Sequence, residues 1–122
     1  MGRILVTALV LAAMALPAQA QYFTLGGDDL DACAANGEVV GLKQEGDNFL
    51  AVRAGPGTSH AKLDELRMRD AVYICTEDGD WYGIVYGDDD CGVTSPIDPP
   101  RPYTGPCASG WVHSRYINVT AG

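Results

Sequence analysis

The sequence predicts an all-β fold, a small barrel or sandwich, from three features of the chain. Runs rich in β-branched and aromatic residues recur at short intervals, as in AVYIC (71–75) and WYGIVYG (81–87), and such runs are typical of strands. Turn-forming Gly, Pro, Asn and Asp separate the runs. No segment keeps a helical period, so we expect short strands that pack around one small core.

Several segments follow this pattern, in chain order 38–44, 49–54, 60–70, 71–75, 81–87 and 110–119. We expect strands throughout, except that Leu63 and Leu66 in the third segment can anchor either a short strand or one helical turn. The Asp-Gly pair within residues 76–80 predicts a hairpin turn. Alternation along the strands predicts an inward-facing core, formed by Leu50, Val52, Val72, Ile74, Ile84 and Val112.

The strand at 49–54 runs directly into Gly55-Pro56-Gly57. Proline fixes φ and suits the second position of a turn, and glycine tolerates the positive φ that can follow it. We therefore expect a sharp turn in which Gly55 or Gly57 holds a conformation that a β-branched residue resists. A long loop that covers one end of the domain is expected to follow.

Residues 1–20 are expected to be a signal peptide. Arg3 supplies a short positive segment, an uncharged apolar run covers 4–16, and small residues in an A-x-A pattern precede Gln21. The apolar run is short for a bilayer span, although a retained N-terminal anchor is the alternative. Cleavage before Gln21 leaves enough chain for one small domain, exported to the periplasm or beyond.

Removal of the signal peptide makes the chain more acidic. Without Arg3, sixteen Asp and Glu face seven Lys and Arg, so the net charge of the exported chain is −9. An acidic surface argues against nucleic acid and against anionic membrane as partners. It is compatible with basic proteins or cationic ligands, and also with a charge that serves solubility alone.

All four cysteines follow the expected cleavage site: Cys33, Cys75, Cys91 and Cys107. An even number in a small exported chain indicates two disulfides and an oxidising compartment, and the absence of a C-x-x-C pair disfavours a zinc site. Three connectivities are possible. Cys91 and Cys107 bracket a proline-rich segment, and closing that loop stabilises the fold by roughly 3 kcal/mol. This predicts Cys91–Cys107 and leaves Cys33–Cys75.

Three stretches in order resemble the bacterial SH3-like (SH3b) modules of exported envelope proteins: LAVRAGPGTSHAKLDEL (50–66), AVYICTEDGDWYGIVY (71–86) and SGWVHSRYI (109–117). The family pattern is an L-x-V-R strand, x-G-P, a short apolar segment, a hairpin whose second strand begins with Trp, and a final G-W-V-x-x-x-Y. The resemblance covers residues 37–118. It implies a small SH3-like barrel over 37–119, preceded by an N-terminal extension at 21–36.

One departure from that family is the connection at 88–109. The family joins its Trp strand to G-W-V by a short turn, whereas here the connection contains Asp88-Asp89-Asp90, two cysteines and the run PIDPPRPYTGP. We expect a disulfide-closed insertion, and both a functional loop and an inert decoration remain open. In the N-terminal extension, Gly26-Gly27 is expected to be a flexible joint.

The sequence does not predict catalysis. His60 and His113 are the only histidines, and no serine or free cysteine is placed for activation by either of them. The acidic run 88–90, alone or with Asp28, Asp29 and Asp31, offers oxygen ligands but lacks the spacing of a calcium loop. We therefore expect a solvated acidic turn, no metal and no cofactor.

The aromatic residues are the candidates for ligand binding. In the SH3-like family the usual recognition surface is a groove between the long loop and the hairpin turn, and in cell-wall-targeting members it binds peptidoglycan peptides. The resemblance therefore implies ligand contact by Trp81, and with less support by Tyr82 and His60. The insertion leaves the same hairpin, and its disulfide is expected to hold Tyr103 as a fixed projection that also contacts the ligand. Core or rim packing of these rings is the alternative.

Two functions are compatible with these features. The first is a non-catalytic exported module that recognises peptidoglycan peptide or another cell-envelope ligand. The second is a secreted acidic protein that binds or inhibits a basic partner, such as a cell-wall lytic enzyme. We expect a monomer in either case, with no nucleic-acid partner and no membrane association once the signal peptide is removed.

Overall fold

The computed structural model describes residues 23–46, 48–88 and 90–122, and the expected signal peptide lies outside them. The described residues are all-β, as predicted, with one short 3-10 helix, η1 (Ser114–Tyr116), and no α-helix. The strands in chain order are β1 (Thr24–Leu25), β2 (Ala35–Val39), β3 (Leu50–Arg53), β4 (Lys62–Leu66), β5 (Ala71–Asp78), β6 (Trp81–Tyr86), β7 (Arg101–Pro102), β8 (Ala108–His113) and β9 (Ile117–Ala121).

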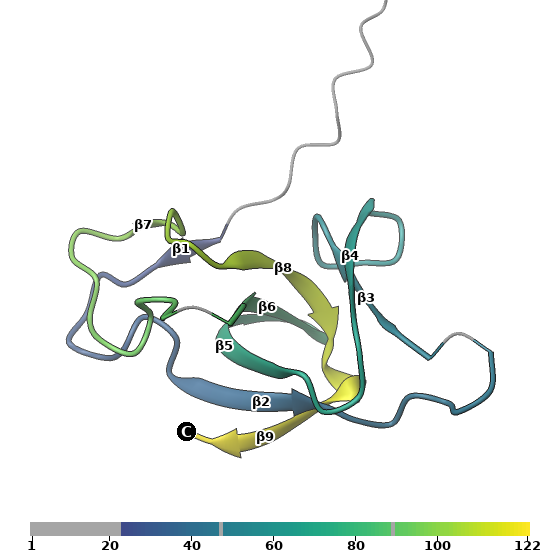
Figure 1. Ribbon diagram of the computed structural model, residues 1–122. Coiled ribbons are helices and arrows are strands. Elements are labelled where there is room, and N and C mark those ends of the chain that lie inside the picture. Colours follow the sequence, from purple (N-terminus) through teal and green to yellow (C-terminus); the bar gives the residue numbers. More distant parts are fainter. Residues whose placement is uncertain (1–22, 47, 89) are drawn as a thin grey trace, which may run out of the picture.

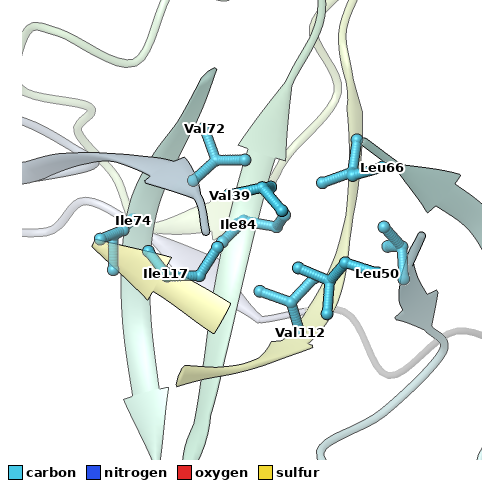
Figure 2. Packing of buried hydrophobic residues seen from close by; sticks show 9 residues of the cluster. Val39, Leu50, Leu66, Val72, Ile74, Ile84, Val112 and Ile117 are labelled. Carbon is cyan, nitrogen blue, oxygen red and sulfur yellow. The ribbon is translucent and has the colours of Figure 1, made fainter. Parts of the chain in front are cut away.

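Seven strands form one antiparallel sheet in the order β4-β3-β8-β6-β5-β2-β9 (Figure 1). Every strand of this sheet supplies a buried side chain to a single cluster, the first core (Figure 2), which consists of Val39, Leu50, Val52, Leu66, Val72, Ile74, Ile84, Val112 and Ile117. The two end strands, β4 and β9, contribute Leu66 and Ile117 to the same cluster. The sheet therefore curls around the first core.

The predicted core is confirmed, since all six residues expected to face inward belong to the first core. In the segment 60–70 the strand alternative is correct, because β4 pairs with β3. Leu66 is 6% exposed, whereas Leu63 is 48% exposed. The two leucines are three positions apart, so in a strand they point to opposite faces. Only Leu66 can therefore reach the core, and the expected anchoring role of Leu63 is wrong.

The sheet begins earlier in the chain than predicted. The strand expected at 38–44 is β2, Ala35–Val39, so the end of the expected extension at 21–36 belongs to the sheet. Gly37 concealed this strand, because glycine is depleted in strands. An added Cβ at Gly37 would lie 2.7 Å from Ile117 Cγ2, so the close approach of β9 requires glycine at this position.

The central hairpin is longer than predicted. β5 continues to Asp78 and pairs it with Trp81, the first residue of β6. The turn between them consists of Gly79 and Asp80, and Gly79 has a φ of 59°, a conformation that glycine adopts without steric cost. The strand expected to end at Cys75 therefore extends through most of the predicted turn.

The outer face of the sheet carries a second cluster of buried side chains, the second core. Val85 of β6 belongs to it and Tyr73 of β5 packs against it, because alternation places both opposite their neighbours in the first core. Both pack against the N-terminal segment and the insertion, which contribute Phe23, Leu25, Ala32, Cys33, Cys91, Val93, Ile97, Tyr103 and Cys107. Leu25 is 1% exposed and Val85 is fully buried. The insertion is therefore packed onto the sheet.

Backbone hydrogen bonds join the N-terminal segment to the insertion. β1 pairs with β7, and the two lie side by side in Figure 1. Gly27 N–H donates to the Ile97 carbonyl at 2.8 Å, and Cys33 N–H donates to that of Val93 at 3.0 Å. The prediction of a flexible joint at Gly26-Gly27 is wrong, because the bond to Ile97 holds Gly27 and because Gly26 packs so closely that an added Cβ would collide with the Ile97 backbone. Both glycines have positive φ, 85° and 95°.

Both disulfides have the predicted connectivity. Cys33–Cys75 joins the N-terminal segment to β5, with the two Cα atoms 3.9 Å apart. Cys91–Cys107 closes the insertion, with a Cα separation of 5.4 Å. All four cysteines lie in the second core or pack against it. The two bonds therefore hold the N-terminal segment and the insertion, together called the cover, on the outer face of the sheet.

The turn at Gly55-Pro56-Gly57 differs from the predicted one. Gly57 N–H donates to the Gly55 carbonyl at 2.9 Å, which places Pro56 at the centre of a three-residue γ-turn. Neither glycine has a positive φ, so the expected left-handed conformation is wrong. Gly55 is required for space, since an added Cβ would lie 2.6 Å from His60 Nδ1, whereas the nearest atom to a Cβ on Gly57 would be 3.5 Å away.

We expect Gly55→Val to lower the free energy of unfolding by about 1–3 kcal/mol, because the new side chain must displace the packed His60 ring. Gly57→Val serves as the matched control and should cost clearly less. Guanidinium melts of the two oxidised variants measure the difference. Equal losses, or a greater loss for Gly57→Val, would contradict the role given to His60.

Candidate functional site

An open groove of about 490 Å³ lies where the loop after β2, the loop after β3, the start of β6 and the end of β8 converge. Its lining residues are Gly41, Leu42, Lys43, Phe49, Leu50, Ala51, Arg53, Thr58, Trp81, His113, Arg115 and Tyr116. The lining thus combines rings and apolar side chains with three cations. A concave surface with a few charged groups is the usual form of a ligand site.

The groove continues the outer face of the sheet beyond the cover. Trp81 and His113 are register partners on β6 and β8, and their rings meet edge-on with centroids 5.4 Å apart. The next pair on this face is Gly83 with Trp111. There Phe23 packs edge-on against Trp111 at 5.5 Å and lies 2.9 Å from where a Cβ on Gly83 would be. The N-terminal segment therefore covers the sheet as far as Trp111 and leaves Trp81 and His113 in the groove.

His113 is held in one orientation at the end of β8. Its Nδ1 accepts a hydrogen bond from the Arg115 backbone N–H at 3.0 Å and so caps η1. Because Nδ1 is an acceptor, the proton of the neutral ring lies on Nε2. The ring of Tyr116 lies 6.4 Å from that of His113. Trp81, His113 and Tyr116 therefore form a continuous aromatic wall.

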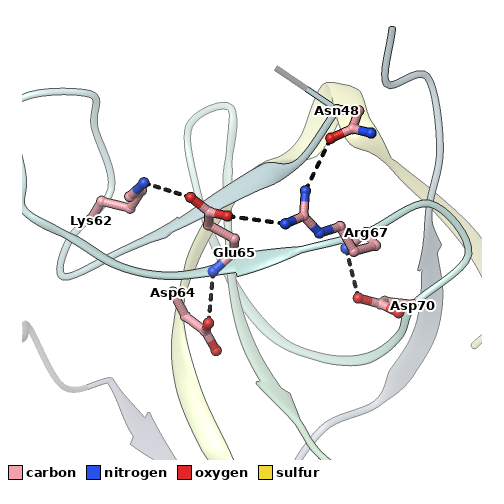
Figure 3. A network of polar contacts seen from close by, with 6 residues as sticks. All are labelled: Asn48, Lys62, Asp64, Glu65, Arg67 and Asp70. Carbon is pink, nitrogen blue, oxygen red and sulfur yellow. Dashed lines mark hydrogen bonds and ion pairs between the residues drawn. The ribbon is translucent and has the colours of Figure 1, made fainter. Parts of the chain in front are cut away.

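Phe49 adds a further ring to the groove. It is held by Lys62 of β4 and by Arg67, which directly follows that strand. Lys62 Nζ lies 4.7 Å and Arg67 Cζ 5.8 Å from the ring centroid, within the range of cation–π contacts. Glu65 forms ion pairs with both cations, at 2.7 and 3.3 Å, and Arg67 donates to Asn48 Oδ1 at 3.1 Å (Figure 3). Such surface contacts add little stability, but they position Phe49.

The sequence prediction placed Trp81 at the groove, and the structure does so too. Tyr82 packs against the first core instead. His60 lies against Gly55 in the loop after β3, and from this loop Thr58 reaches the groove. Of these three predicted residues, the structure brings only Trp81 into the groove, and ligand contact by any of them remains a prediction.

Tyr103 does not lie beside Trp81. It packs against the second core, where its hydroxyl donates to the Cys91 carbonyl at 2.8 Å and accepts from the Cys107 N–H at 3.1 Å. These bonds connect the two ends of the insertion. The side chain is therefore part of the internal packing of the insertion, and the expectation that it projects as a fixed anchor is wrong.

The sequence prediction missed Phe49, His113, Arg115 and Tyr116 as groove residues. His113 is two positions after Trp111 and thus on the same face of the strand, which is a signal that the sequence carries. The pairing of His113 with Trp81 is not readable in this way, because it depends on the register between strands that the insertion separates.

Tyr86, outside the groove, forms a polar link between β6 and β4. Its hydroxyl donates to Asp64 Oδ2 at 2.8 Å. Partial burial of the phenol, followed by this hydrogen bond and the nearby carboxylate charge, raises the pKa of Tyr86 above its ordinary value. The phenol therefore stays protonated at neutral pH and acts as a structural donor.

Within 23–46, 48–88 and 90–122, no three or more His, Cys, Asp or Glu side chains are grouped so that they could hold a metal ion. The same part of the chain contains no helix with the length and apolar character needed to cross a membrane.

Part of the chain is similar to part of a known protein. A stretch of 53 residues, 43% of this chain, is 40% identical to a protein named bacteriocin BCN5 from Clostridium perfringens. The match spans 6% of that protein's length, so the chain corresponds to a small part of it. No protein-family model and no solved structure matches the chain. The two disulfides indicate an extracellular or secreted protein.

Proposed function

We propose that this protein is a non-catalytic exported binding module with an SH3-like fold, and that it recognises peptidoglycan peptide or another extended ligand of the cell envelope. The groove with its aromatic wall carries this proposal. Trp81, His113 and Tyr116 provide flat surfaces already held by strand pairing and capping. Such rings provide a large contact area and lose little conformational entropy on binding.

The SH3-like assignment draws support from the positions of the motif residues. Leu50 and Val52 of the L-x-V-R strand and Val112 of G-W-V all contribute to the first core. Trp81 begins the second strand of the hairpin, as the family pattern requires. Likeness to part of a bacteriocin supports an exported protein, although the match is too short to transfer an activity.

We expect Trp81→Ala to weaken binding to purified peptidoglycan sacculi by about thirtyfold or more, because truncation of an aromatic anchor typically costs about 2 kcal/mol. Co-sedimentation with sacculi over a range of protein concentrations measures the affinity. Ala51→Leu tests the same groove from β3, because Ala51 is a lining residue and a larger side chain there takes up space in the groove. It should weaken binding without removing an aromatic contact.

Tyr103→Ala is the matched control, because it removes a ring from the insertion and leaves the groove lining intact. A melting curve for each variant separates loss of binding from loss of fold. If folded Trp81→Ala and Ala51→Leu bind sacculi as tightly as the parent, the groove is not the wall-binding site. If the parent ignores sacculi and captures a basic lytic enzyme, the alternative function replaces the proposed one.

A further inference from the structure

The charges around the groove are opposite in sign to those of the chain as a whole. The full sequence contains sixteen Asp and Glu but eight Lys and Arg. Three of those eight, Lys43, Arg53 and Arg115, line the groove, and none of its described lining residues is acidic. Two more, Lys62 and Arg67, lie over the ring of Phe49, which is itself a lining residue. Basic residues are thus concentrated at this site.

Two of the lining cations have no ionic partner among the described residues. The ion pairs found there join Lys62 and Arg67 to Glu65, and neither Lys43 nor Arg115 has a side-chain hydrogen bond to another described residue. Their positive charges are therefore available to a ligand.

Arg53 is partly committed to the fold. One of its terminal nitrogens donates to the His60 carbonyl at 3.0 Å and so braces the loop after β3. A guanidinium carries five N–H donors, so this single bond leaves others for a ligand. Because the bond fixes the side chain at the groove, Arg53 presents them from a defined position.

From this juxtaposition we infer that the ligand is an extended peptide that carries carboxylate groups. This deepens the proposed function and rests on the groove being the binding site. Guanidinium groups bind carboxylates through paired, charge-assisted hydrogen bonds. Leu42, Phe49 and Trp81 line the same groove as the cations and supply apolar contact, which suits peptide side chains. A phosphate polymer such as a polyglycerol phosphate would leave that apolar surface without contacts.

Two ligand pairs test the inference. The first is purified sacculi with free carboxyl groups against the same sacculi after conversion of those groups to amides. The second is a synthetic peptide of alternating leucine and glutamate against its leucine–glutamine counterpart. We expect each carboxylate form to bind at least roughly tenfold more tightly, since a charge-assisted bond contributes more than a neutral one. Raised salt should narrow the gap.

Variants of the lining cations should reproduce the effect of amidation. Lys43→Gln and Arg115→Gln together should weaken binding of the carboxylate forms roughly tenfold and leave that of the amide forms nearly unchanged. Arg101→Gln is the matched control, because Arg101 is an exposed residue of β7 and does not line the groove. It removes one positive charge where the double variant removes two, and it should have no more than a small effect.

The outcomes separate this inference from the proposed function. If neither amidation nor the double variant changes the binding of sacculi, the carboxylate ligand is overturned and the wall-binding function is kept. Binding of the glutamate peptide without binding of sacculi would support the carboxylate ligand and overturn the wall target. If polyglycerol phosphate competes more strongly than the glutamate peptide for binding to the protein, the ligand is a phosphate polymer and the inference is overturned. If the protein binds none of these ligands, both the carboxylate inference and the proposed function are overturned.

Discussion

Replacement of both Cys33 and Cys75 by alanine is expected to lower the free energy of unfolding by about 4 kcal/mol, the loop-closure contribution of a bond between residues so far apart. The bond spans 42 positions in sequence and connects the N-terminal segment to β5. Without it the unfolded chain gains conformational freedom, and the cover of the outer face loses a covalent attachment. The guanidinium midpoint of the double variant measures the loss.

The second disulfide provides the comparison. Cys91 and Cys107 are 16 positions apart, and the same relation gives about 3 kcal/mol for their replacement by alanine. The Cys33–Cys75 variant should therefore be the less stable of the two. A Cys33–Cys75 variant that unfolds at the midpoint of the parent would show that this bond contributes nothing to stability.

Leu25→Ala is expected to lower the free energy of unfolding by about 2–5 kcal/mol, as is usual when a buried leucine is truncated and leaves a cavity. Leu25 is 1% exposed and lies in the second core with Val85 and Val93. The sequence suggested that this residue belongs to an extension outside the domain, and such a position would tolerate the change. Thermal and guanidinium melts decide between the two descriptions.

Leu30→Ala is the matched control for this substitution. Leu30 belongs to the same segment but is 64% exposed, so its truncation should change the stability by no more than about 0.5 kcal/mol. If both leucine variants unfold like the parent, the second core does not contribute to the stability of the domain.

Most of the first core was predictable because it follows from local alternation. Leu50 and Val52 two positions apart, and Val72 and Ile74 likewise, identify the inward faces of β3 and β5. Gly37 concealed β2, since the need for glycine there arises from contact with Ile117 in a distant strand. Gly55 was recognised as special for the wrong reason, because the steric demand of His60 cannot be read from a turn motif.

The candidate site was less predictable than the fold. Trp81 was identified from its place at the start of a strand, whereas Tyr103 was assigned to the same surface and instead packs against the second core. The sequence represents the insertion as one long loop between cysteines. It does not show that the N-terminal segment forms hydrogen bonds with this loop and that both cover the outer face of the sheet.

The sequence by itself determined the all-β class, the inward faces of the main strands and the pairing of the four cysteines, because each depends on local periodicity or on the spacing of residues along the chain. Only the tertiary structure decided where the cover ends and which side chains form the groove. Strand register places Trp81 beside His113, and the cover ends where the ring of Phe23 packs against that of Trp111. Both contacts join segments that are distant in sequence, and no local pattern encodes their distance in space.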